Sequence, residues 1–373
     1  MPLLYAQLPR LFTISIFGAQ YHADSLPSAS KQDLIDRFGA LVHESAVYVD
    51  ELTHDDSERG AGLSRVWVSY WQSPEDFQQW WSSPVVSDFW SGLADDAGFW
   101  RETLHFPSTR FINEVTQDVP SGVGHLRLEP LAPLTEKSGY WGAYRDRLEE
   151  ATAEDRLSSP LESVPTPKLP DGTIRRGRVQ MTSFPDNICY VIEGQDHTPL
   201  KEHEGKVWSD KFHRITKRWV TNVLRAGPEG GLLTSRMCHV PESGMIRVEK
   251  AESDVPDDPD VYPALNINRK VEVFFFLELK HMERVGRRDK THVALRTEFM
   301  KTYGPGGIMS HGDLLLWVEL GILKAQDMEA EYIGCYDGTG FLAYDHHPSF
   351  RSTTRFSSTG GAWSKVGSLF GLS

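Results

Sequence analysis

The sequence predicts an α+β fold built from two halves of similar design. Apolar residues alternate with a period of two in several short runs, which indicates strands, and they recur with helical spacing in the segments between these runs. The same order of runs is found before residue 150 and after residue 187. Hydrophobic residues make up 39% of the 373-residue chain and charged residues 24%, which is sufficient apolar material for a large core.

The first half begins with a strand. Strands are predicted over 11–18 and 64–71, where apolar and polar residues alternate, and an amphipathic helix is predicted over 31–43. Residues 73–76, Ser-Pro-Glu-Asp, have the composition of a helix start, with a serine cap, proline at the first position and acids in the first turn. The aromatic-rich helical segment that follows is expected to extend to Trp90.

The second half repeats this order after residue 187. The predicted elements are strands over 188–192, 232–240, 271–279 and 314–323, a long helix over 201–224 and a helical segment over 282–300. Strand–helix units with intervening strands predict two ferredoxin-like modules, whose antiparallel sheets would pack together or close into a barrel.

This pattern predicts four parts along the chain. The first module covers 1–150, a linker 151–186, the second module 187–347 and a tail 348–373. The linker is rich in Glu, Ser and Pro and the tail in Ser, Thr and Gly, so both are expected to lie on the surface.

Charge and cysteine content exclude several classes of function. A net charge of −13 argues against nucleic acid as a partner, because phosphate binding requires clusters of Lys and Arg. The N-terminus lacks the pattern of a signal peptide and no apolar stretch is long enough to span a membrane, so we expect a cytoplasmic protein. The three cysteines, Cys189, Cys238 and Cys335, lie in apolar runs and are interpreted as buried thiols.

His292 is the most informative single residue. It lies in a helical segment between two strongly apolar predicted strands, a setting in which an imidazole can point into an apolar pocket and bind haem iron. In the first half the corresponding segment offers Val85 and Val86 and no histidine, so only the second module is expected to bind a metal. An ordinary half-buried histidine is the alternative, and a cysteine thiolate is a weaker candidate for the iron ligand.

Four segments, in this order, resemble the haem-containing aldoxime dehydratases: 139–147, 187–196, 291–294 and 332–340. The resemblance implies a dimeric α+β barrel of ferredoxin-like modules, a haem b cofactor and His292 as the proximal iron ligand. It also implies an activity, the conversion of an aldoxime R–CH=N–OH to a nitrile. In that family ferrous haem binds the oxime nitrogen, and a distal histidine, a serine, an arginine and a glutamate assist the proton transfers.

The chain departs from the family where the distal histidine is expected. Val318 stands at that position, in the run Leu-Leu-Trp-Val-Glu over 315–319. His311, a few residues earlier, is the predicted substitute, and an exposed loop histidine is the alternative reading of that residue.

The other distal groups match less directly. Ser235 is the predicted serine, with Thr234 as the second choice. The family often carries arginine before a Gly-Gln-Asp turn, but here Glu193 precedes it, and Arg178 is predicted to serve instead. Glu136 is the candidate for the glutamate.

Three functions remain open on these grounds. The first is a haem-dependent lyase that dehydrates an aldoxime, and the second is a haem enzyme of the same scaffold acting on another N–O or N–N bond. The third is a non-catalytic barrel that binds haem or an apolar ligand. The expected partners are a small-molecule substrate and a second copy of the chain.

Overall fold

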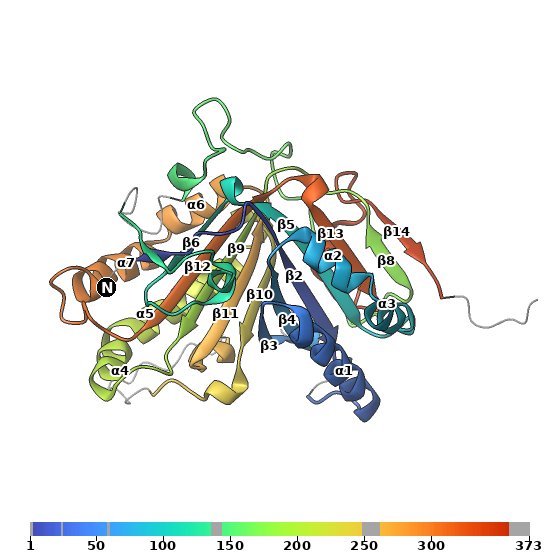
Figure 1. Ribbon diagram of the computed structural model, residues 1–373, viewed down its shortest axis with the longest axis horizontal. Coiled ribbons are helices and arrows are strands. Elements are labelled where there is room, and N and C mark those ends of the chain that lie inside the picture. The colour runs from blue at the N-terminus through green and yellow to red at the C-terminus, as the bar shows by residue number, and fades with distance from the viewer. Residues whose placement is uncertain (1–2, 24, 58–59, 136–143, 248–261, 358–373) are drawn as a thin grey trace, which may run out of the picture.

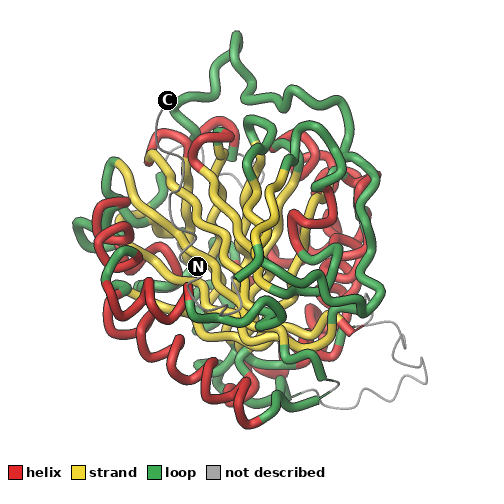
Figure 2. Tube along the Cα trace, turned by 90° about the vertical axis from the view of Figure 1, so that its right-hand side faces the viewer, coloured by secondary structure: helices red, strands yellow, loops and turns green. Residues whose placement is uncertain are grey.

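The computed structural model describes residues 3–23, 25–57, 60–135, 144–247 and 262–357. The fourteen strands of these residues form one antiparallel sheet, which confirms the α+β class. Figure 1 shows the sheet folded over on itself, with helices α1 to α3 on one outer side and α4 to α7 on the other. Figure 2 shows the strands running together through the middle of the molecule.

The first half contributes four neighbouring strands in the order β5-β2-β4-β3. The strands are β2 (Leu11–Gln20), β3 (Tyr48–Asp56), β4 (Gly62–Trp71) and β5 (Phe99–Pro107), and the helices are α1 (Ala29–Ser45), α2 (Pro74–Trp81) and α3 (Pro84–Ser91). The Ser73 side chain caps α2 by accepting a hydrogen bond from the backbone N–H of Asp76 (3.1 Å), as the sequence predicted. The single helical segment predicted to Trp90 is divided into two helices, because Pro84 cannot continue the first one.

The second half contributes four strands in the order β10-β11-β9-β12. The strands are β9 (Ile188–Asp196), β10 (Leu232–His239), β11 (Arg269–Phe276) and β12 (Leu315–Leu323), and the helices are α4 (Glu202–Trp208), α5 (Arg214–Arg225), α6 (Leu279–Arg288) and α7 (Lys290–Tyr303). A π-helical turn over Ser209–His213 joins α4 to α5, so the predicted long helix is interrupted there. Both halves follow the order strand, helix, strand, strand, helix, strand. They join where β3 pairs with β10.

Short strands extend both ends of this eight-stranded centre. They are β1 (Leu4–Tyr5), β6 (Phe111–Val115) and β7 (Ala132–Pro133) beyond β12, and β13 (Met328–Ile333), β8 (Arg178–Met181) and β14 (Ser352–Arg355) beyond β5. Residues 352–355 of the expected tail lie at the surface, where they pair with β8. The expected linker likewise supplies β8 itself.

The inner faces of the two halves meet in a common core. Tyr70 of β4 donates a hydrogen bond to Glu319 of β12 (3.0 Å), which links strands from opposite halves. The outer face of the second half carries a separate apolar cluster that packs against α5 and α6. The site described below lies on that outer face.

The cysteines are buried and unpaired, as predicted. Burial raises the pKa of the Cys238 and Cys335 thiols to about 12, so both are neutral at pH 7. Across the described ranges, none of the helices is long and apolar enough to cross a bilayer.

Candidate functional site

Three helices hold the imidazole of His292. The Asp289 carboxylate caps α7 by accepting hydrogen bonds from the backbone N–H groups of Thr291 (2.7 Å) and His292 (3.0 Å), which places His292 in the first helical turn. Its Nδ1 lies 2.5 Å from the carbonyl oxygen of Gly286 on α6. The ring stacks on Trp219 of α5, with centroids 4.2 Å apart. Because a carbonyl can only accept, Nδ1 carries the proton and Nε2 keeps the lone pair that a metal requires.

His292 lines a cavity between these helices and the outer face of the sheet. The space between the helices and the sheet, open solvent at the mouth included, amounts to about 1240 Å³. The apolar part of the wall is formed by Val191, Trp208, Trp219, Val223, Phe274, Phe276, Met282, Val285, Leu295, Phe299, Met300, Leu316 and Val318.

The helical side of the cavity favours a neutral imidazole and an anionic ligand. Burial lowers the pKa of His292, and the positive charge of Arg296 lowers it further, against the raising effect of the Gly286 hydrogen bond. A neutral imidazole is the form that binds a metal. Arg287 and Arg296, which also line the cavity, provide positive charge on the same side.

The sheet side of the cavity carries a row of three side chains. Val318 of β12 pairs directly with Glu193 of β9, and Glu193 pairs with Glu272 of β11. Directly paired residues point to the same face of a sheet, and Val318 and Glu193 line the cavity. Burial raises the pKa of Glu193 to about 7. Burial, followed by the charge of Glu193, raises the pKa of Glu272 to about 8, against the opposing charge of Lys270.

The structure does not bring His311 to this cavity. The residue is exposed in the turn between α7 and β12 and is not part of the cavity wall. The end of that turn is held in place, because the Glu204 carboxylate of α4 accepts hydrogen bonds from the backbone N–H groups of Asp313 (2.7 Å) and Leu314 (3.1 Å). The alternative interpretation, an exposed loop histidine, describes its position, and the distal role of His311 stays a prediction.

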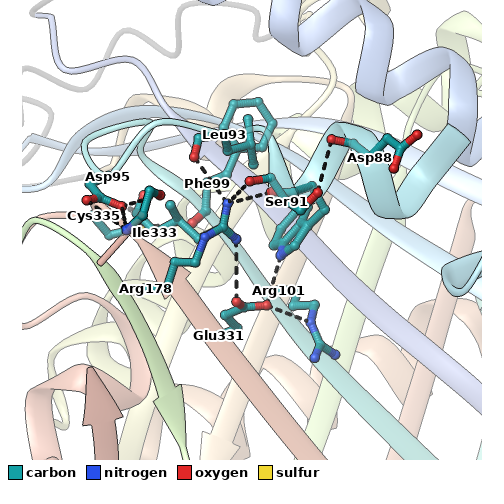
Figure 3. Close-up of polar contacts among 12 residues, drawn as sticks. Asp88, Ser91, Leu93, Asp95, Phe99, Arg101, Arg178, Glu331, Ile333 and Cys335 are labelled. Carbon is teal, nitrogen blue, oxygen red and sulfur yellow. Dashed lines mark hydrogen bonds and ion pairs between the residues drawn. The ribbon is translucent and has the colours of Figure 1, made fainter. Parts of the chain in front are cut away.

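Arg178 also lies elsewhere, on β8, which is near the opposite end of the strand order from β12. Figure 3 shows its polar contacts. Its Nη2 donates hydrogen bonds to the carbonyl oxygens of Trp90 (2.7 Å), Ser91 (2.9 Å) and Leu93 (3.1 Å), which follow or end helix α3. Its Nη1 lies 3.7 Å from Glu331. The guanidinium therefore satisfies the last carbonyls of a helix in the first half, away from the cavity, and its role in the site stays a prediction.

Ser235 lies one strand away from the cavity. It pairs with Phe274, which lines the cavity, but Ser235 and Thr234 themselves line a second hollow beside β10. Glu136 lies outside the described residues, so its prediction stays open. Sequence reasoning missed Glu272, because only the register of β11 against the strand that carries Glu193 brings the two residues side by side.

Comparison with known proteins identifies the family. The family model of the haem-containing dehydratases matches residues 15–341. The chain belongs to this family. The haem cofactor and the resemblance inferred from sequence are thereby confirmed.

Individual relatives within the family are distant. The chain is 25% identical to a phenylacetaldoxime dehydratase of Bacillus sp. (strain OxB-1) over 80% of this chain and 78% of that protein. It is 25% identical to an aliphatic aldoxime dehydratase of Rhodococcus globerulus over 87% of this chain and 84% of that protein. The fold is similar to that of an aldoxime dehydratase crystallised with butyraldoxime (TM-score 0.69, 19% identity, 91% of this chain and 88% of that one).

The cavity fits the cofactor of this family. Its wall combines a neutral histidine whose Nδ1 is held by a backbone carbonyl, aromatic and aliphatic side chains, and two arginines. Haem iron takes such a histidine as its axial ligand, and an arginine suits the carboxylates of the macrocycle.

Proposed function

We propose that this protein binds haem b through His292 and dehydrates an aldoxime to a nitrile. The observation that carries the proposal is the imidazole of His292, held through Nδ1 by Gly286 with Nε2 left to bind iron, in a cavity of a chain that belongs to the haem-containing dehydratases. The names of the relatives, phenylacetaldoxime and aliphatic aldoxime dehydratases, support the substrate class.

The reaction sets clear requirements for the protein. When bound, haem would be held by His292 and would supply a ferrous iron to activate the oxime. Conversion of R–CH=N–OH to R–C≡N and water needs one proton delivered to the hydroxyl oxygen and one removed from carbon, with no net change in oxidation state. The side chains of the cavity must therefore exclude bulk water and present an acid and a base to the substrate. The apolar wall excludes water, and Glu193 on the sheet side of the cavity provides an ionisable group.

The architecture of the proposed enzyme is two ferredoxin-like modules, 1–150 and 187–347, joined by 151–186 and followed by the tail 348–373. The repeated order of strands and helices supports this division. We further propose a cytoplasmic homodimer that has no nucleic-acid or membrane partner. Light scattering of the purified protein would test the dimer by its mass.

The activity is tested with haem-loaded protein under anaerobic conditions. Phenylacetaldoxime or butyraldoxime is added to dithionite-reduced protein, and nitrile is measured by gas chromatography. Nitrile formation by the reduced protein and its loss in the air-oxidised protein are expected. A protein with a normal Soret band that forms no nitrile from either oxime would favour the second candidate, a haem enzyme acting on another N–O or N–N bond. The absence of a distal histidine at Val318 is the observation in favour of that candidate.

A further inference from the structure

Two glutamates are directly paired on the face of the sheet that the cavity lies against, where an apolar surface would suffice to hold a cofactor. Glu193 and Glu272 are directly paired across β9 and β11, so their side chains leave the same face side by side. Glu193 is part of the cavity wall. Glu272 is fully buried, and within the described residues neither of its carboxyl oxygens has a hydrogen-bond partner. A buried, unpaired carboxylate is costly, which indicates that the group is kept for a ligand or a proton.

We propose that Glu193 and Glu272 share a proton and that Glu193 acts as the acid and base of the reaction in place of a distal histidine. This inference rests on the proposed function, because it assigns the proton transfers of that reaction. Glu193, in the wall, is the catalytic residue that touches the substrate. Glu272, behind it, is the positioning residue that keeps the proton available. Val318, on the other side of Glu193, offers no competing ionisable group.

The charges around the pair are consistent with a single shared proton. Two carboxylates side by side cannot both ionise readily, and burial disfavours the charged form of each. Lys270, in the next row, is the cation on the same face of the sheet, and it is itself held by the carbonyl oxygen of Ile267 (2.9 Å). From the helices, the ionisable groups of the wall are Glu283, Arg287, His292 and Arg296.

The proton transfers balance without a further reactant. The acid form of Glu193 gives its proton to the hydroxyl oxygen of the oxime, the N–O bond breaks and water leaves. The resulting carboxylate takes the proton from the oxime carbon as the C≡N bond forms, which restores the acid. Glu272 stabilises both the acid form and the carboxylate form of Glu193, because it can accept the shared proton or return it. The pair therefore has the same charge before and after turnover.

The first test compares isosteric variants with a matched control. Glu193→Gln should slow turnover by ~10²–10⁴-fold, the usual contribution of a positioned acid or base, and leave the Soret band and the affinity of ferrous protein for the oxime unchanged. Glu272→Gln should shift the alkaline limb of the pH–rate profile to lower pH, because Glu193 loses a negative neighbour.

Glu319→Gln is the control. Glu319 is equally buried and follows Val318 in β12, but it faces the inner core, where it accepts hydrogen bonds from Tyr70 (3.0 Å) and the backbone N–H of Val123 (2.7 Å).

The second test does not require turnover. Infrared spectroscopy of the haem-loaded protein between pH 7 and pH 8, the range between the pKa values of the two groups, should show a protonated carboxyl band that shifts in D₂O and disappears in Glu193→Gln and in Glu272→Gln. Burial also raises the pKa of Glu319 to about 8, so Glu319 has a carboxyl band of its own, and Glu319→Gln should remove that band and leave the band of the pair in place. The absence of such a band, with Glu272 ionised against Lys270, would overturn the proposal. So would wild-type turnover in both variants. If the wild-type protein forms no nitrile from any oxime, the proposed function fails, and the infrared band alone decides whether the pair shares a proton.

Discussion

Val318 and Glu193 are directly paired on β12 and β9, with both side chains on the wall of the cavity that contains His292. At these two positions the family resemblance leads one to expect a histidine and an arginine. The chain instead has an apolar residue beside a carboxyl group whose pKa is raised by burial to about 7. The site therefore keeps the histidine that we propose binds iron and differs from the family in the residues at these two positions.

Replacement of His292 by Ala should abolish stoichiometric haem binding, because the macrocycle then keeps only apolar contacts with the wall. The measurement is the Soret absorbance of purified protein after haem reconstitution. The polypeptide should retain its circular dichroism spectrum, since the core of the sheet does not depend on His292. His311→Ala, in the exposed turn, is the matched control and should bind haem normally. Full haem binding with an unchanged spectrum in His292→Ala would refute the axial assignment.

Removal of the α7 cap should loosen the site. Asp289→Ala loses the acceptor for two backbone N–H groups and should lower the free energy of unfolding by about 1 kcal/mol, as measured by urea denaturation. Haem affinity should fall as well, because the first turn of α7 orients His292. Asp289→Asn keeps a side-chain oxygen acceptor and should stay close to wild type. Equal losses in both variants would show that the charge of Asp289, rather than the cap, is responsible.

A histidine at position 318 should replace the proton donor when Glu193 is disabled. In a Glu193→Gln background, Val318→His should recover part of the ~10²–10⁴-fold rate that a positioned acid contributes. The imidazole would enter the cavity from the strand next to Glu193. Val318→Leu in the same background tests the effect of size alone and should not recover turnover. Rescue by leucine as large as that by histidine would contradict the interpretation.

Stability should depend on pH through Glu193. Its pKa is raised from 4.5 to about 7, so between these values the folded protein retains a proton that the unfolded chain releases. This contribution is complete below about pH 4.5 and is lost as the pH rises through about 7. The free energy of unfolding of the wild type should therefore fall relative to that of Glu193→Gln between pH 5 and pH 8. Parallel curves from chemical denaturation across this range would contradict a raised pKa.

Hydrophobic periodicity predicted the strands whose buried face is apolar. The alternating run over 11–18 became β2, and the apolar run over 314–323 became β12. Strands β3 and β5 were missed because their buried residues are partly polar. Asp50 of β3 pairs with Arg269 (2.6 Å), and Glu102 of β5 accepts hydrogen bonds from Arg236 (2.6 and 2.8 Å). Such residues are buried only because a partner distant in sequence neutralises them, which no local pattern reveals.

The residues of the candidate site, like the strands, could be predicted only in part. His292 was identifiable because its helix lies between two apolar strands and matches a family motif. Arg178 and His311 were chosen by nearness in sequence to the expected positions, but a strand or a turn a few residues long can carry a side chain to another face or edge of the sheet. The pairing of Glu193 with Glu272 joins residues almost eighty positions apart, and only the register of β9 against β11 brings them together.

The position of β13 in the sheet has a consequence for synthesis of the chain. Strand β5 ends at residue 107, but its outer neighbour β13 spans residues 328–333. While the ribosome makes the intervening stretch, the edge of β5 has unpaired N–H and C=O groups that can bind another extended chain. The amino-terminal half is therefore prone to aggregate until β13 has been synthesised and can pair with β5. Expression of residues 1–150 alone should yield insoluble material, whereas the complete chain can close that edge.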